Sequence, residues 1–165
     1  MPFEKTAGWM LHGEWLLPFV GHAHYDGKLD TWLGLHNHDR YFCRPDGYLC
    51  AGNVTSDPSE WKVSKEKVCC LEEDTAAGWV QVDAKLVPME TTDEAGTEYC
   101  LMERLRPVEG DEECLGDGDK CRLRLSTFHV KSGENGEPVA TPSRPPRSYK
   151  VSRYNMFFKP QVFWM

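Results

Sequence analysis

The sequence predicts an all-β fold: an antiparallel β-barrel of about eight strands or a two-sheet β-sandwich, with at most one short helix. Two-residue turn signals such as Asp-Gly and Ala-Gly recur along the chain, and the runs between them are short. Several runs alternate apolar and polar residues, which is the period of a half-buried strand. Aromatic residues make up 12% of the chain and include six Trp, which favours a β-rich core. The length of 165 residues suits a single domain, 1–165.

The clearest strands are 79–86 and 121–129. The first places Val80, Val82, Ala84 and Leu86 on one face, and the second does the same with Cys121, Leu123 and Leu125. The other expected strands are 13–25, 29–43, 48–55, 66–72, 97–106 and 148–165. This strand count resembles that of lipocalin-like or calycin barrels, a likeness of architecture alone that does not fix function.

Between the strands we expect one helical turn and two loops. Asp57 and Pro58 fit the cap and first turn of a short helix. Residues 109–120 are acidic, and residues 134–147 are rich in proline and polar residues. Both segments are predicted to be loops.

The charge balance disfavours several function classes. The chain has 26 acidic and 19 basic residues, a net charge of −7, and no Lys/Arg-rich run of about five or more that would mark a nucleic-acid-binding face. No stretch approaches the roughly 18 apolar residues of a membrane span. The first ten residues, MPFEKTAGWM, lack the features of a signal peptide. We therefore expect a soluble, cytoplasmic protein with no nucleic-acid or membrane partner, which could form a homo-oligomer.

Four of the seven cysteines fall in a repeated element, Cys-x-x-Asp-Gly-x-x-Cys, which pairs Cys43 with Cys50 and Cys114 with Cys121. A two-residue turn at each Asp-Gly would place both cysteines of a pair opposite each other, within reach of a disulfide. Three interpretations stay open: free thiols, two hairpin disulfides, or a four-cysteine zinc site with unusually long spacing.

The segment GHAHYDGKLDTWLGLHNHDRYFC, residues 21–43, holds two His-x-His pairs: His22/His24 and His36/His38. A two-residue turn at Asp26-Gly27 would place Tyr25 opposite Lys28. Alternation then puts His22 and His24 on an inward, Leu- and Val-rich face. The other pair falls on the opposite face, so the four histidines do not form one site.

The inward face is the predicted catalytic site. His22 and His24 would form the polar end of an apolar pocket and transfer protons, assisted by His129 from another strand. Tyr25 and Asp30 could join if a bulge turned them inward. The opposite face is the predicted ligand-binding surface, formed by Trp15, Trp32, His36 and His38.

No cofactor is expected, with a divalent metal ion as the alternative. His22 and His24 would be its ligands, because imidazoles two residues apart on a strand project side by side. A third ligand would come from His129, His12, Asp83 or the glutamates of 97–103. Neither His pair is followed by a suitably spaced glutamate, as the cupin pattern requires.

These patterns lead to one leading function and two alternatives. The first is a small barrel that holds a small, mostly apolar organic molecule, with or without metal-free lyase or isomerase chemistry at the histidines. The second is a non-enzymatic module that binds a carbohydrate or a protein through Trp and His. The third is a metal-dependent enzyme that uses a His-x-His pair.

Overall fold

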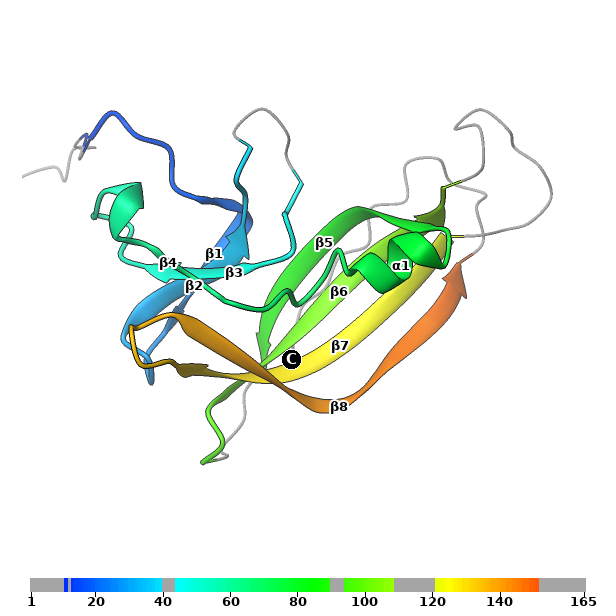
Figure 1. Cartoon of the computed structure of the whole chain (residues 1–165). Helices are drawn as coiled ribbons and strands as arrows, with labels where there is room; N and C mark the ends of the chain where they lie inside the picture. The colour runs from blue at the N-terminus through cyan, green and yellow to red at the C-terminus, as the bar shows by residue number, and fades with distance from the viewer. Residues whose placement is uncertain (1–10, 12, 40–43, 90–93, 109–120, 152–165) are drawn as a thin grey trace, which may run out of the picture.

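The computed structural model describes residues 11, 13–39, 44–89, 94–108 and 121–151, and shows an all-β chain of two four-stranded antiparallel sheets (Figure 1). Sheet A contains β1 (Phe19–Asp26), β2 (Thr31–His36), β3 (Leu49–Gly52) and β4 (Lys62–Val63), in that order. Sheet B contains β5 (Trp79–Met89), β6 (Thr97–Pro107), β7 (Cys121–Ser132) and β8 (Pro138–Val151), also in chain order.

The two sheets share one hydrophobic core. Leu33 and Leu35 of β2 and Leu49 of β3 pack in one buried cluster with residues of β5, β6 and β7. The sheet B members of that cluster are Leu86, Tyr99, Leu101, Phe128 and Val130. The described strands form two layers that are not closed into a barrel, so the predicted sandwich fits and the barrel is not seen.

A hydrogen bond reinforces the contact between the sheets. Tyr99, 1% exposed on β6, donates its hydroxyl to Asp26 Oδ2 at the end of β1, over 2.9 Å. The other carboxylate oxygen of Asp26 accepts the backbone N–H groups of Lys28 and Leu29 in the following turn. One buried carboxylate therefore orders the β1–β2 turn and attaches it to sheet B.

The described chain has two short helical elements, one between β3 and β4 and one between β4 and β5. The 3₁₀ turn η1 (Pro58–Glu60) begins after Asp57, whose side chain accepts the Ser59 N–H at 2.9 Å, so the predicted cap is confirmed. The predicted strand 66–72 is wrong, because residues 66–71 are irregular and Glu72 begins the helix α1 (Glu72–Ala76). Within the described ranges, no helix is long and apolar enough to cross a membrane.

The β1–β2 hairpin differs from the predicted one. Asp26 pairs with Thr31, so the connection is Gly27–Asp30 rather than a two-residue turn, and Asp30 takes a left-handed conformation with φ 51°. The register also shifts between Val20 and His24, where Gly21 has φ 74°. The predicted pairing of Tyr25 with Lys28 is therefore wrong. The longer turn lets the Asp26 side chain accept hydrogen bonds from the N–H groups of Lys28 and Leu29.

The predicted loop 134–147 is mostly strand β8. Residues 148–151 of the predicted strand 148–165 also belong to β8, and its remaining residues, 152–165, lie outside the described residues. β8 lies at the edge of sheet B. On the solvent side of an edge strand, a proline, which has no N–H, removes no hydrogen bond to another strand. The pairing register between β7 and β8 shifts twice, once between Leu125 and Thr127 and once between Thr127 and Phe128. At each shift β8 contains one more residue than β7, so β8 bulges around Pro142–Pro146. Bulges at an edge accommodate the prolines that favoured a loop.

Candidate functional site

The structure separates the predicted catalytic residues. His24 donates from Nε2 to the backbone oxygen of Leu86 on β5, over 2.8 Å, which places its ring between the sheets. His22 is exposed beside the β1 irregularity. His129 lies opposite Glu98 on the face of sheet B that points away from the shared core, because the adjacent Phe128 points into that core. The three imidazoles do not meet in one site.

Tyr25 and Asp30 do come together, on the exposed side of the hairpin. The phenol of Tyr25 donates to Asp30 Oδ1 over 2.5 Å, and this hydrogen bond raises the pKa of Tyr25 above its ordinary value. Tyr25 is 54% exposed and its ring packs against Trp32, with centroids 5.7 Å apart. This pair is a surface feature of the turn, separate from His24.

The predicted ligand-binding residues are also dispersed. His36 donates from Nδ1 to Asp46 Oδ2 over 2.6 Å, while His38 is exposed. Trp15 is half-buried and Trp32 packs on Tyr25. Among the residues that the structure describes, no three His, Cys, Asp or Glu side chains gather to hold a metal ion.

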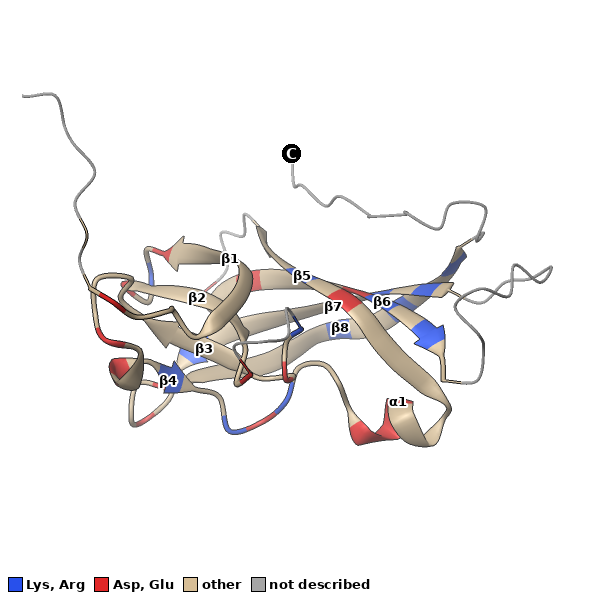
Figure 2. Cartoon of the chain, turned by 90° about the horizontal axis from the view of Figure 1, so that it is seen from above, with Lys and Arg blue, Asp and Glu red and all other residues tan. Residues whose placement is uncertain are grey.

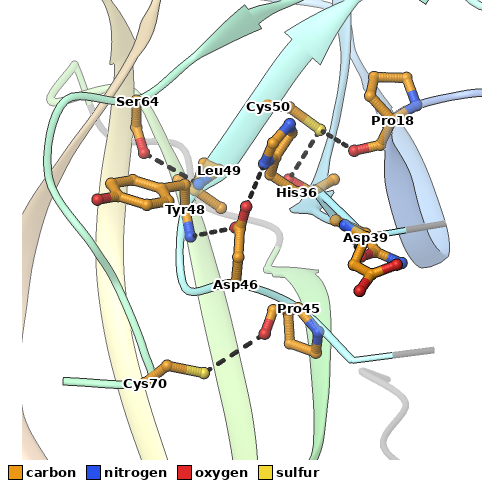
Figure 3. A network of polar contacts seen from close by, with 12 residues as sticks. Pro18, His36, Asp39, Pro45, Asp46, Tyr48, Leu49, Cys50, Ser64 and Cys70 are labelled. Atoms are coloured by element: carbon orange, nitrogen blue, oxygen red, sulfur yellow. Dashed lines mark hydrogen bonds and ion pairs between the residues drawn. The ribbon is translucent and has the colours of Figure 1, made fainter. Parts of the chain in front are cut away.

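A cysteine, a histidine and an aspartate meet at the His36–Asp46 pair (Figure 3). Cys50 lies on the same face as His36, because Cys50 pairs with Gly34, two residues away along β2. Its thiol is fully buried and lies 3.6 Å from the carbonyl oxygens of Pro18 and Gly34. Burial, followed by the charge of Asp46, raises the pKa of Cys50 to about 12, so this thiol is protonated at neutral pH and is not an activated nucleophile.

The described cysteines Cys50, Cys69, Cys70, Cys100 and Cys121 are free thiols. Cys50 belongs to β3 and pairs with Gly34 and Val63, so it does not pair across a turn at Asp46-Gly47 as the hairpin disulfide requires. That part of the disulfide hypothesis is wrong. The partner positions Cys43 and Cys114 lie outside the described residues.

A groove of about 370 Å³ lies between the segment 64–71, which connects the sheets, and strands β7 and β8. We call it the β8 groove. Its apolar lining comes from Val68 and Leu71 on one side and from Phe128, Val139 and Ala140 on the other. Three prolines of β8 add to the same wall: Pro138, Pro142 and Pro146. The volume falls in the range of about 300–1,000 Å³ that is typical of small-molecule sites.

Charged side chains surround this apolar lining. Lys65, Lys67 and Arg144 contribute three positive charges, and Glu66 and Glu137 two negative ones. The groove is thus locally cationic in a protein whose net charge is −7. Figure 2 shows the basic residues in blue along sheet B and the acidic residues of α1 in red.

The cations of the groove differ in how far they are engaged. Lys65 Nζ lies 2.8 Å from Glu137 Oε1, in a close ion pair. Lys67 Nζ lies over the Tyr48 ring at 5.5 Å, and Arg144 Nη2 lies 4.0 Å from Glu98 Oε1 with its side chain 68% exposed. Of the three cations that line the groove, Arg144 and Lys67 are therefore less tightly engaged than Lys65.

Replacing Glu137 by glutamine is expected to destabilise the fold at neutral pH but not in strong acid. The hydrogen bond from Lys65 and those from backbone N–H groups lower the pKa of Glu137 from 4.5 to about 2. Because the folded-state pKa is depressed, the stabilisation is complete above about pH 4.5 and is lost as the pH falls towards 2. Urea unfolding over this range should show the difference between wild type and Glu137→Gln shrinking with falling pH. Glu134→Gln is the exposed control, and a difference that is constant with pH would contradict the ion pair.

A second polar cluster is buried at the other end of sheet B. Arg124 on β7 donates two hydrogen bonds to Glu103 on β6, from Nε over 2.8 Å and from Nη2 over 3.0 Å. The same guanidinium contacts both carboxylate oxygens of Asp74 on α1, at 2.6 and 2.7 Å. Glu103 is fully buried and also accepts a bond from Gln81 on β5 at 2.9 Å. This cluster holds α1 on the sheet.

Sequence reasoning missed both the groove and the buried cluster. Two features of the sequence could have indicated the groove. The spacing of the prolines in 138–146 predicts an irregular edge strand, and Lys65 and Lys67 alternate with other residues in the segment beside it. The cluster could not be inferred, because Arg122 and Arg124 alternate with the apolar residues of 121–125 and so suggest a solvated face.

Comparisons with known proteins give a family. No curated protein and no solved structure gives a significant match to the chain. One family model, described as a protein of unknown function (DUF1668), matches residues 4–149. Because this match spans most of the sequence, the chain belongs to the DUF1668 family.

Proposed function

We propose that this protein is a non-enzymatic binding module that holds a small, mostly apolar organic anion in the β8 groove. The proposal keeps the small organic ligand expected from the sequence but changes the polar end of its site. Arg144 and Lys67 would contact the anionic group in place of His22 and His24.

The observation that carries the proposal is an apolar lining with cations beside it. Val68, Leu71, Phe128 and the three prolines form an apolar surface that can contact the hydrocarbon or aromatic part of a ligand. An anion would gain from the exposed guanidinium of Arg144, which can bind a carboxylate or sulfonate through two parallel N–H groups. Electrostatic attraction of this kind selects for charge and geometry more than it adds affinity.

The same lining supports binding rather than turnover. No histidine is among the groove residues that the structure describes, so no imidazole there would move a proton. Two of the described tryptophans, Trp61 and Trp79, are engaged within the protein and are not free to stack on a glycan. Trp61 is 5% exposed and donates Nε1 to Asn53 O over 3.1 Å, and Trp79 stacks beneath Arg122 with the guanidinium 4.0 Å from the ring centroid.

The test is fluorescence titration with the aromatic sulfonate 1-anilinonaphthalene-8-sulfonate, followed by competition with dodecanoate and with dodecanol. We expect dodecanoate to displace the dye better than the neutral alcohol. Arg144→Ala should weaken dodecanoate binding about fivefold to tenfold, which corresponds to roughly 1 kcal/mol for an exposed charge contact. Val139→Glu, which adds a carboxylate to the lining, should weaken it more.

Arg147→Ala is the matched control. Arg147 is an exposed arginine of the same strand that does not line the groove, so its removal should change the affinity by less than about twofold. Equal affinities in Arg144→Ala and Arg147→Ala, or equal competition by acid and alcohol, would contradict anion recognition in the groove. Circular dichroism of each variant confirms that the fold is retained.

A further inference from the structure

Two adjacent cysteines, Cys69 and Cys70, lie on the segment that connects the two sheets. Cys69 is fully buried in the shared core, and Cys70 is partly exposed. Cys70 has φ 53°, a left-handed conformation that non-glycine residues seldom adopt and that costs on the order of 1 kcal/mol or more. Such a conformation persists only where the surroundings fix it.

The loop before β3 fixes this conformation. The carbonyl of Gly47 accepts the N–H groups of Val68 at 2.8 Å and of Cys69 at 3.3 Å. Gly47 has φ 105°, and a Cβ at this position would collide with the backbone oxygen of Cys69. Glycine is required here because the loop backbone lies directly against the dithiol.

The Cys70 sulfur has two acceptors within reach. Its Sγ lies 3.2 Å from Gln81 Oε1 and 3.5 Å from the carbonyl oxygen of Pro45, the contact drawn in Figure 3. Gln81 in turn donates to Glu103, a member of the buried cluster around Arg124. The dithiol is thus at one end of a hydrogen-bonded chain that reaches α1.

The two thiols are chemically different. The thiol of Cys69 donates a hydrogen bond to the sulfur of Cys70, and this bond lowers the pKa of Cys70, with a further contribution from the charge of Lys67. The same bond, followed by burial, raises the pKa of Cys69. At neutral pH Cys70 therefore has the greater thiolate fraction and Cys69 keeps its proton, as in an attacking and a resolving cysteine.

We propose that Cys69 and Cys70 form a thiol–disulfide exchange site, which a low-molecular-weight disulfide oxidises to a vicinal disulfide. The Cys70 thiolate attacks one sulfur of the reagent, whose S–S bond breaks; one thiolate leaves and takes up the proton that Cys70 had lost. The Cys69 sulfur then attacks Cys70, releases the second thiol with the proton of Cys69, and closes the Cys69–Cys70 bond. The protein loses two electrons and two protons, and the reagent gains both.

Because the two cysteines are adjacent in the chain, the disulfide between them is readily reduced back to two thiols. Consecutive Cα atoms are about 3.8 Å apart, below the range of about 4.4–6.8 Å that disulfides usually span. A strained disulfide is a better oxidant and is reduced more easily than a structural one. The site goes beyond the proposed ligand binding, because neither cysteine lines the β8 groove.

The test is incubation of the reduced protein with glutathione disulfide, followed by alkylation of the remaining thiols and mass mapping. Cys69 and Cys70 share one tryptic peptide, residues 68–85, which contains no other cysteine. We expect this peptide to become about 2 Da lighter than its reduced form, without an added glutathione or alkyl group. Excess reduced glutathione should restore both thiols. Cys70 should react at least about tenfold faster than the buried Cys50.

Two variants separate the roles of the cysteines. Cys69→Ser should stop at a glutathione adduct on Cys70, whereas Cys70→Ser should give no adduct at position 69. Cys50→Ser is the control and should react as wild type. The proposal is overturned if wild-type protein keeps a stable glutathione adduct on Cys70, or if Cys50 reacts as fast as Cys70. The wild-type mapping decides this even if a variant does not fold.

Discussion

Replacing Arg124 by methionine is expected to lower the free energy of unfolding by about 3–5 kcal/mol, measured by urea unfolding at neutral pH. The guanidinium contacts Glu103 and Asp74 with four hydrogen bonds, and Glu103 is completely shielded from water. Removing the cation leaves a buried carboxylate whose remaining side-chain donor, within the described part of the chain, is Gln81. An uncompensated buried charge costs far more than the ion pair itself contributes.

Two further variants make this expectation specific. Arg147→Met removes an exposed arginine on the neighbouring strand and should change stability by less than about 0.5 kcal/mol. The double variant Arg124→Met/Glu103→Leu removes both buried charges and should recover much of the loss. If Arg124→Met is as mild as Arg147→Met, the buried cluster does not hold α1 as described.

Leu33→Ala should cost about 2–5 kcal/mol and should loosen both sheets at once. Leu33 is fully buried on β2 and belongs to the same cluster as Leu86 of β5 and Leu101 of β6. The cavity left by a shortened side chain therefore weakens a contact between layers as well as within sheet A. Urea unfolding gives the energy, and amide hydrogen exchange shows where protection is lost.

The exposed Leu16, 62% accessible, provides the control, and Leu16→Ala should change stability by less than about 0.5 kcal/mol. In Leu33→Ala, exchange should accelerate at β6 amides near Leu101 as well as in β2. Loss of protection confined to sheet A would contradict a core shared by the two sheets.

The elements that the sequence predicted well are those decided by local rules. The alternating runs 79–86 and 121–129 lie within β5 and β7, and the expected run 97–106 lies within β6. Asp57 caps η1 as expected, since a cap depends only on a side chain and an N–H two residues later.

The Pro-rich strand β8 could not be predicted from local pattern, because its four prolines disfavour an ordinary strand. It forms because β7 provides backbone hydrogen-bond partners along one side of β8. The other side is the edge of the sheet, where a proline without an N–H breaks no hydrogen bond to a neighbouring strand. Local pattern also did not show which face of β7 points into the core. The residues on that face include Arg124, whose burial depends on Glu103 and Asp74 from other elements.

The positions of the predicted site residues likewise depend on turn lengths and on contacts between distant segments, which the local pattern does not show. The His-x-His pairs are conspicuous in the sequence, but a bulge and a longer turn in β1–β2 separate them from His129. The β8 groove is formed by two segments more than fifty residues apart, and neither carries a motif by itself. Its residues become a set only when the connecting segment 64–71 lies beside β8.

The measurement that most directly tests the β8 groove as the binding site is an amide ¹H–¹⁵N spectrum of the labelled full chain during titration with dodecanoate. We expect the largest shift changes at residues 64–71 and 138–144, which form the two walls, and small changes in the β1–β2 hairpin. The largest changes at Trp32, His36 or the Tyr25–Asp30 pair would instead place the ligand on the hairpin surface and contradict the groove.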